Sequence, residues 1–161
     1  MRCLVVYHSL SGTTRKVAEQ AAQFLGADIA EVRASRYRGG LLGFLRAGHD
    51  SWVGRLPPIE VSGGSPETYD FVLVMAPVWV GHASTPIRAY LGQNRGKLRS
   101  AAFLLTCGNS TPPRAFEEMS SLSGVKPEAV FSLRERNIKA GSALPPTIAS
   151  FLSAIKLKQA A

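Results

Sequence analysis

The sequence predicts an α/β domain in which five parallel strands form one sheet between two layers of helices. Short apolar runs rich in β-branched residues recur along the chain, and segments with helical periodicity lie between them. Continuously apolar strands that alternate with helices are typical of a parallel sheet buried on both faces. Right-handed crossovers leave few topologies for five such strands, and the order 2-1-3-4-5 is a common one. We therefore expect a three-layer sandwich with that strand order.

Each predicted element has its own signal. The strands are short apolar runs that end in polar or glycine-containing turns, and we place them at Arg2–Tyr7, Asp28–Val32, Tyr69–Ala76, Ser100–Thr106 and Ala129–Leu133. The helices are predicted at Thr13–Leu25, Pro86–Gln93, Pro113–Ser121 and Pro146–Lys156. Gly26 should stop the first helix, Ser84 is the expected N-cap of the second, and Pro77 should end the third strand.

Residues 33–66 differ from the rest of the chain. They contain five arginines, several glycines and the pair Pro57-Pro58, and only Leu41–Leu45 would fit a single helical turn. We interpret 33–66 as a long irregular excursion from a single domain that spans residues 1–161. Such a segment in a compact domain is often functional, so it could cover a ligand, offer a partner surface or pack on the sheet.

Composition narrows the classes of function. The chain has 161 residues, with 19 Lys and Arg against 11 Asp and Glu, a formal net charge of +8. Net charge alone is a weak argument for nucleic acid, which we do not expect as a partner. The two cysteines, Cys3 and Cys107, are far apart and form no metal-ligand pattern, so we expect a reducing, cytoplasmic setting and no metal. The sequence has no apolar run long enough for a signal peptide or a membrane span, and we expect no membrane partner.

Three loops should carry the chemistry. They follow the first, third and fourth predicted strands and comprise residues 8–14, 77–84 and 107–112. In the expected topology they meet beyond the carboxyl ends of the strands, at the point where the strand order reverses. Ligands of open α/β sheets bind at that point.

The first loop, Ser9-Leu10-Ser11-Gly12-Thr13-Thr14, leads into a predicted helix. A helix start presents unpaired N–H groups and the positive end of the dipole, so it attracts an anion. Four hydroxyls within six positions exceed what an ordinary N-cap needs, and we expect a phosphate to bind here. The loop has neither the Gly-Lys-Ser/Thr of a P-loop nor the glycines of a dinucleotide fingerprint.

This loop resembles the phosphate loop of the flavodoxin family, Ser/Thr-x-Ser/Thr-Gly-x-Thr. The stretch from Ala76 to Ile87 is similar to the second flavin-contacting loop of short flavodoxin-like proteins, and Thr106–Ser110 resembles the third. The resemblance implies a flavodoxin-like fold that binds FMN. It also implies which residues contact the flavin: Ser9, Leu10, Ser11, Gly12, Thr13 and Thr14 at the phosphate, and Pro77, Val78, Trp79, Val80, Gly81, Cys107, Gly108 and Asn109 around the ring.

Within that set, the resemblance gives Trp79 the role of a wall against the flavin ring, although a tryptophan packed at the sheet edge is the alternative. The Val80-Gly81 peptide is the candidate to change orientation when the flavin is reduced. Cys107, Gly108 and Asn109 would contribute backbone groups. His8 and His82 border the expected site and could donate a hydrogen bond there or be plain surface histidines.

The resemblance implies a redox protein that transfers electrons through bound FMN, with no catalytic side chain of its own. Many electron-carrying flavodoxins are acidic, whereas this chain is basic, so we expect a redox partner protein with an acidic surface. The first alternative is an enzyme, an NAD(P)H-dependent quinone or flavin reductase with the same FMN site. The second is a module that binds another phosphate without redox chemistry.

Overall fold

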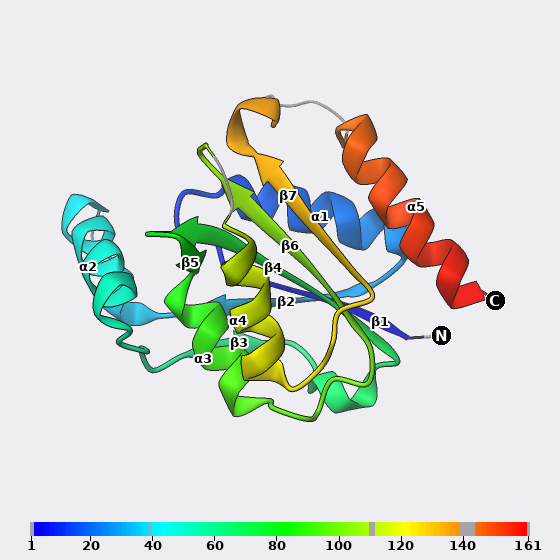
Figure 1. The fold of residues 1–161 in the computed structure, drawn as a ribbon, viewed down its shortest axis with the longest axis horizontal. Helices are drawn as coiled ribbons and strands as arrows, with labels where there is room; N and C mark the ends of the chain where they lie inside the picture. Colours follow the sequence, from blue (N-terminus) through cyan, green and yellow to red (C-terminus); the bar gives the residue numbers. More distant parts are fainter. Residues whose placement is uncertain (1, 39, 110–111, 139–143, 161) are drawn as a thin grey trace.

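The computed structural model describes residues 2–38, 40–109, 112–138 and 144–160. Strands and helices alternate along most of the chain (Figure 1). In chain order they are β1 (Cys3–Tyr7), α1 (Thr13–Leu25), β2 (Asp28–Arg33), α2 (Gly40–Val53), β3 (Glu60–Ser62), β4 (Phe71–Trp79), β5 (His82–Ala83), α3 (Thr85–Gln93), β6 (Ala101–Cys107), α4 (Pro113–Ser123), β7 (Ala129–Arg134) and α5 (Pro146–Ala160). Three 3₁₀ turns lie between them: η1 (Ser35–Tyr37), η2 (Pro66–Thr68) and η3 (Glu135–Asn137).

The strands of the described residues form a seven-stranded sheet in the order β3-β2-β1-β4-β6-β7, with β5 paired to β4. Strands β2, β1, β4, β6 and β7 are parallel, whereas β3 and β5 run antiparallel to their neighbours. The prediction of a five-stranded, wholly parallel sheet was therefore wrong, because antiparallel β3 and β5 make the sheet mixed and larger, and the order of the whole sheet differs from 2-1-3-4-5. Within the five parallel strands, the order β2-β1-β4-β6-β7 is the predicted one. The two additional strands have three and two residues, which is too short for a hydrophobic pattern to reveal them.

Helices cover both faces of the sheet, which confirms the predicted α/β architecture. Successive residues of β1 point to opposite sides, so Leu4 and Val6 pack beneath α3 and α4 while Val5 packs beneath α1 and α5. Figure 1 shows α1 and α5 close together on their side of the sheet. The two apolar layers are fully buried and hold the strand ends in place for the loops that follow.

Helix α1 has the predicted limits because its signals agree. Val17, Ala18 and Ala21 form its buried stripe. Gly26 follows in the left-handed conformation, with φ of 63°, and its N–H reaches back to the last turn of the helix. This helix carries the first loop at its N-terminus, so its position fixes that loop relative to the sheet.

Helix α2 was missed, and the prediction of an irregular excursion over residues 33–66 was wrong for Gly40–Val53. Its buried face consists of Gly43, Ala47, Asp50 and Ser51, which give no apolar stripe to detect. A Cβ at Gly43 would lie 2.1 Å from the carbonyl oxygen of Tyr37, so the helix packs against η1 only because glycine stands there.

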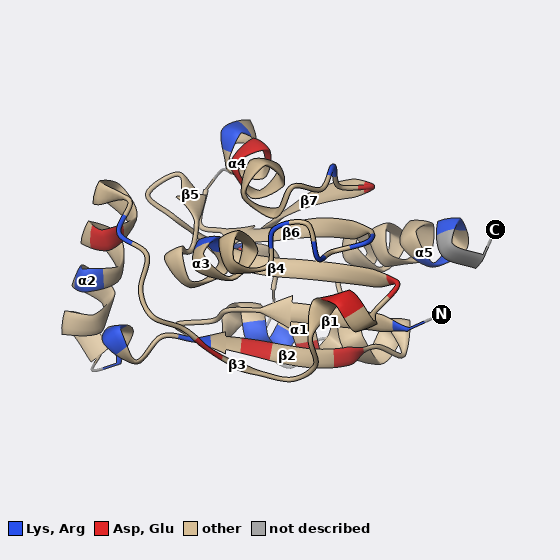
Figure 2. Cartoon of the chain, turned by 90° about the horizontal axis from the view of Figure 1, so that it is seen from below, with Lys and Arg blue, Asp and Glu red and all other residues tan. Residues whose placement is uncertain are grey.

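The large side chains of α2 face outward instead. Figures 1 and 2 show the helix at one end of the molecule, standing off from the sheet. Its large exposed apolar side chains are those of Leu41, Leu42, Phe44, Leu45, Trp52 and Val53. None of the described helices, α2 included, is long and apolar enough to cross a membrane.

Strand β4 continues past Pro77, where the sequence predicted its end. The last residue of β4 that pairs with β1 is Met75, opposite Tyr7, and β5 pairs with β4 only from Val78 onward. Pro77 therefore follows the last β4 residue that pairs with β1 and precedes the first that pairs with β5. The N–H that proline lacks is not needed for the ladder between β4 and β1. The strand runs on to Trp79 and carries that residue beyond the edge of β1.

Candidate functional site

The ends of β1, β4 and β6 lie at one edge of the sheet, as the topology predicted. Tyr7 pairs with Met75, and Pro77 pairs with Thr106, so the three loops that follow these strands begin side by side.

The first loop is closed by its own hydrogen bonds. The Gly12 N–H donates to Ser9 Oγ at 3.0 Å, and the hydroxyls of Ser11 and Thr13 lie 3.2 Å apart. Gly12 has a φ of 91°, and a Cβ added there would meet nothing within 4 Å. No side chain caps the start of α1. The loop therefore leaves the helix start and the space above Gly12 open to an anion.

The Thr14 hydroxyl is turned away from that opening. It lies 2.8 Å from the hydroxyl of Thr106 on β6, and both side chains are buried. This bond ties the first turn of α1 to the centre of the sheet. Of the four predicted hydroxyls, those of Ser11 and Thr13 are thus the two that are neither buried nor bonded to a backbone N–H.

The second loop is a tight β-hairpin between β4 and β5. Trp79 pairs with His82, and the two residues between them both have positive φ, 48° for Val80 and 80° for Gly81. Positive φ at both central positions is the geometry of a type I′ turn. A β-branched residue rarely adopts it, so Val80 holds a strained backbone at the tip of the loop.

Trp79 is half-buried and packs on two other rings. The rings of His8 and Tyr37 both meet it edge to face, with centroids 5.4 Å away. The Ser51 hydroxyl of α2 donates to the Trp79 carbonyl at 2.7 Å. The tryptophan is therefore held by the residue that follows β1, by η1 and by α2 together, which fixes its ring.

The described residues of the third loop, Cys107–Asn109, differ in exposure. Cys107 is buried at the end of β6, and its thiol lies 3.6 Å from the carbonyl oxygen of Leu133, so the side chain fills space in the sheet. Gly108 and Asn109 are exposed. Residues 110–111, the continuation of this predicted loop, lie outside the described residues.

A cleft of about 410 Å³ lies between the first and second loops. Six of the predicted contact residues line it: Leu10, Ser11, Thr14, Pro77, Val78 and Trp79. Three further residues complete the lining: Gly40 and Phe44, from the segment 33–66 that could cover a ligand, and Glu135. Its lining does not include Ser9, Gly12, Thr13, Val80, Gly81, Cys107, Gly108 or Asn109. The new residues come from α2 and η3, elements that the sequence pattern did not reveal.

Asp50 anchors α2 beside this cleft. Its carboxylate is fully buried, pairs with the Arg36 guanidinium and accepts a hydrogen bond from the Tyr37 hydroxyl at 3.1 Å. Hydrogen bonding to Arg36 holds the pKa of Asp50 below its usual range. The same Tyr37 hydroxyl lies 2.7 Å from Thr85 Oγ1 at the start of α3. This network joins η1, α2 and α3, and it places Phe44 at the mouth of the cleft.

Comparison with known proteins identifies the fold. No protein-family model and no curated protein matches the sequence. Solved structures do match: a flavoprotein from Lactobacillus acidophilus NCFM in complex with FMN has a TM-score of 0.71 and 23% identity, over 81% of this chain and 92% of that chain. A provisionally assigned flavoprotein from Bacteroides uniformis has a TM-score of 0.76 and 20% identity, over 94% and 97%. A cysteine-to-serine variant of a Pseudomonas aeruginosa flavodoxin has a TM-score of 0.53 and 17% identity, over 98% and 97%. The chain therefore has a flavodoxin-like α/β fold.

Proposed function

We propose that this protein binds FMN in the cleft between its first two loops and transfers electrons through it. The observation that carries the proposal is that one cleft joins an uncapped helix start to a fixed tryptophan. FMN has a phosphate at one end and an aromatic ring system at the other, so it needs both features in one site. The bound FMN of the Lactobacillus acidophilus structure, which shares this fold, supports the choice of cofactor.

The phosphate would lie at the first loop. The free N–H groups of the first turn of α1 and the hydroxyls of Ser11 and Thr13 supply donors, and the open space above Gly12 admits the group. Thr14 supports the site from below through its bond to Thr106. No lysine or arginine is needed, because the helix start supplies the positive potential.

The ring would lie between Trp79 and Phe44. Both are aromatic and line the cleft, and Val78 and Pro77 make its floor apolar. Bound FMN supplies one- and two-electron chemistry, while these residues orient the ring and limit its contact with water. An apolar wall disfavours added negative charge, so we expect the site to lower the potential at which the flavin accepts its last electron.

A protein with an acidic surface is the partner we propose. The apolar face of α2, formed by Leu41, Leu42, Phe44, Leu45 and Trp52, is largely exposed, with 77% of Trp52 accessible. Arginines flank this face, while Asp50, the one acidic residue on the helix, is buried. An apolar centre with a positive rim fits a partner with an apolar patch and a negative rim. Docking there would bring the partner to the mouth of the cleft at Phe44.

A reductase that takes electrons directly from NAD(P)H is the second candidate. It requires room for another ligand beside the flavin, and a second cleft of about 420 Å³ shares Leu10 and Gly40 with the first.

One experiment separates these candidates. The purified protein is loaded with FMN and reduced stepwise under anaerobic conditions while its visible spectrum is recorded, and NADPH, NADH and a soluble quinone are then added in turn. The electron-carrier proposal predicts reversible reduction with little turnover of the nicotinamide cofactor. Rapid NAD(P)H-dependent quinone reduction would favour the reductase, and a protein that cannot be loaded with FMN would exclude both.

A further inference from the structure

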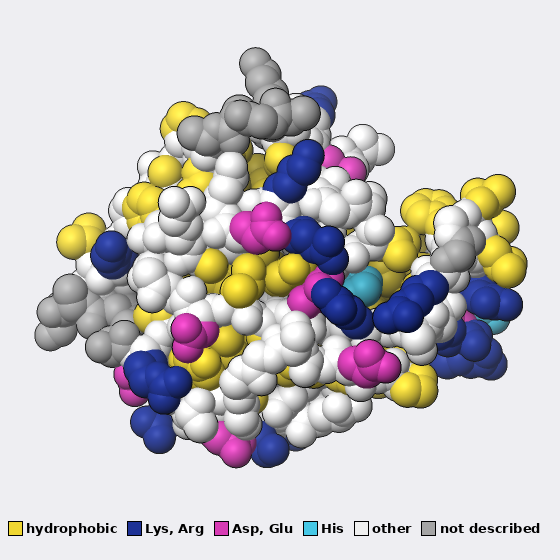
Figure 3. All heavy atoms as spheres, turned by 180° about the vertical axis from the view of Figure 1, so that it is seen from behind, with side chains coloured by type: hydrophobic (Ala, Val, Ile, Leu, Met, Phe, Trp, Pro, Cys, Tyr) yellow, Lys and Arg dark blue, Asp and Glu magenta, His cyan; other side chains and the backbone are white. Residues whose placement is uncertain are grey.

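The second cleft shares Leu10 and Gly40 with the candidate FMN site and lies between the first loop, the end of β2 and η1. Figure 3 shows basic side chains gathered around a hollow on this face of the molecule. The residues that decide its chemistry are Arg15, Arg33, Arg38, Glu31 and His8. Leu10 lines both clefts, so ligands in the two clefts would be neighbours.

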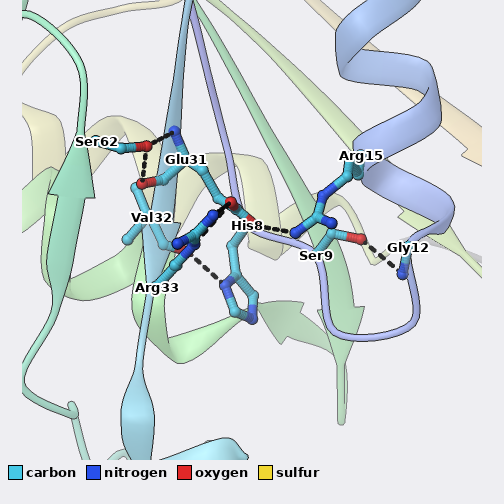
Figure 4. A network of polar contacts seen from close by, with 8 residues as sticks. All are labelled: His8, Ser9, Gly12, Arg15, Glu31, Val32, Arg33 and Ser62. Atoms are coloured by element: carbon cyan, nitrogen blue, oxygen red, sulfur yellow. Dashed lines mark hydrogen bonds and ion pairs between the residues drawn. The ribbon is translucent and has the colours of Figure 1, made fainter.

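The charges in this cleft do not balance. Glu31 pairs with Arg15 and also with Arg33, whose Nε lies 2.7 Å from the carboxylate, as Figure 4 shows. Although burial opposes it, hydrogen bonding to Arg15 and Arg33 holds the pKa of Glu31 below its usual range. Three arginines against one glutamate leave the cleft with a net charge of +2. Arg38 forms no ion pair with any residue that the structure describes, so its guanidinium is available to an anion.

His8 adds an unpaired acceptor. Its Nδ1 lies 2.7 Å from the carbonyl oxygen of Val32. A carbonyl only accepts, so Nδ1 carries the proton and donates, and Nε2 of the neutral ring is left with a lone pair. Nε2 is buried without a hydrogen-bond partner, and only 5% of His8 is exposed. Figure 4 shows the ring between Arg33 and the Ser9 loop. An unpaired buried acceptor costs free energy, which a ligand hydroxyl would recover.

We propose that this second cleft binds a phosphorylated ribose, with the phosphate at Arg38 and Arg33 and a sugar hydroxyl at His8 Nε2. The ring of Tyr37 and the side chain of Ala34 form an apolar wall for the sugar carbons. The cleft volume of about 420 Å³ is ample for such a group. The inference rests on the second candidate function, the reductase, since NADPH carries a phosphorylated ribose and would reach the flavin across Leu10. Binding can nevertheless be tested without any turnover.

Binding is measured by calorimetric titration of the FMN-saturated protein, in which the flavin already fills the phosphate loop. The probe is adenosine 2′-monophosphate, compared with adenosine, which lacks the phosphate, and with inorganic phosphate, which lacks the sugar. We expect saturable binding of one probe per chain, at least about tenfold tighter than either comparator. NADPH should likewise bind about tenfold more tightly than NADH.

Two variants locate the site. Arg38→Gln removes an exposed guanidinium and should weaken the probe about tenfold while FMN affinity stays unchanged. Arg99→Gln removes the same charge at the opposite edge of the sheet, where Arg99 pairs with Asp70 at 3.6 Å, and should change neither affinity. The asparagine of His8→Asn can still donate a hydrogen bond to the Val32 carbonyl, but it places no acceptor where Nε2 lies. It should reduce the preference for the probe over inorganic phosphate.

Several results would overturn the inference: no saturable binding, equal binding of adenosine, or equal weakening by the two arginine variants. Displacement of FMN by the probe would place the phosphate in the first cleft instead. Repeating the probe titration on the apoprotein separates the test of the second cleft from the test of FMN binding in the first. If the protein does not bind FMN but Arg38→Gln still weakens the probe, the proposed function fails and the second cleft stands.

Discussion

Replacing Asp50 by alanine should release α2 from the body of the protein. The carboxylate is fully buried, whereas Arg36 is 36% exposed in its side chain, so the released arginine recovers part of its hydration. Removing one partner of a buried pair costs about 3–5 kcal/mol, and the exposure of Arg36 places this case near the lower end, about 3 kcal/mol. For a chain of this length, that corresponds to a melting temperature lower by roughly 6–12 °C.

Thermal denaturation followed by circular dichroism measures the global effect, and amide hydrogen exchange locates it. We expect protection to fall mainly in η1 and α2, which Asp50 joins, while β1, β4 and β6 stay protected. FMN affinity should fall as well, because Gly40 and Phe44 of α2 line the cleft. Asp70→Ala is the matched control, since the Asp70 pair with Arg99 and its hydrogen bond from the Arg2 N–H are both exposed and should contribute less than about 1 kcal/mol.

The effect of Asp50 should also depend on pH in a defined direction. The Arg36 hydrogen bond lowers the pKa of Asp50, so the stabilisation is fully present above the unfolded value of roughly 3.9 and is lost as pH falls through the folded value. The gap between wild type and Asp50→Ala should therefore be constant near neutrality and narrow in acid. A melting temperature within about 2 °C of wild type, with unchanged exchange in α2, would refute the anchoring role.

Three further predictions concern the framework of the two clefts. Thr14→Val leaves the buried Thr106 hydroxyl without its partner and should lower the free energy of unfolding, measured by urea denaturation, by about 1–3 kcal/mol. The double variant Thr14→Val, Thr106→Val should recover most of this loss, and a loss below about 0.5 kcal/mol in the single variant would contradict the reasoning. Val80→Asn should stabilise the protein by about 1 kcal/mol, because asparagine tolerates the positive φ of the hairpin, and a lower melting temperature would show that Val80 is not strained. Burial lowers the pKa of His8, so as pH falls below roughly 6.5 the unfolded chain takes up the proton before the folded protein does. The free energy of unfolding should therefore decline with falling pH, and His8→Asn should reduce the slope of that decline. An unchanged slope in that variant would assign the effect to other groups.

The parts of the fold that follow one local rule could be predicted from the sequence. Helix α1 has an inward apolar stripe and a glycine stop, so its limits followed to the residue. Strands β1, β4 and β6 are almost continuously apolar, and β2 and β7 are shorter apolar runs that contain polar residues. All five were predicted within three residues at either end. The joining of the first and second loops followed from the topology, since both leave the same edge of the sheet.

The parts that depend on tertiary contacts could not be predicted. Helix α2 packs through Gly43 and a buried aspartate while its leucines face outward, which reverses the usual pattern of a surface helix. Its packing depends on Tyr37, which no sequence period connects to it. The continuation of β4 past Pro77 likewise depends on where β1 ends and β5 begins. The contributions of Gly40 and Glu135 to the cleft were missed for the same reason, whereas Phe44 belongs to the segment that the sequence indicated as a possible cover for a ligand.

Comparison of FMN with riboflavin tests the central proposal most directly. The two flavins share the ring and differ by the phosphate, so titration of the apoprotein, followed by quenching of flavin fluorescence, isolates the role of the first loop. We predict saturable binding of one FMN per chain, with riboflavin at least about tenfold weaker because it cannot use the start of α1. Absence of FMN binding, or equal affinity for riboflavin, would contradict the assignment of the Ser9–Thr14 loop as the phosphate site.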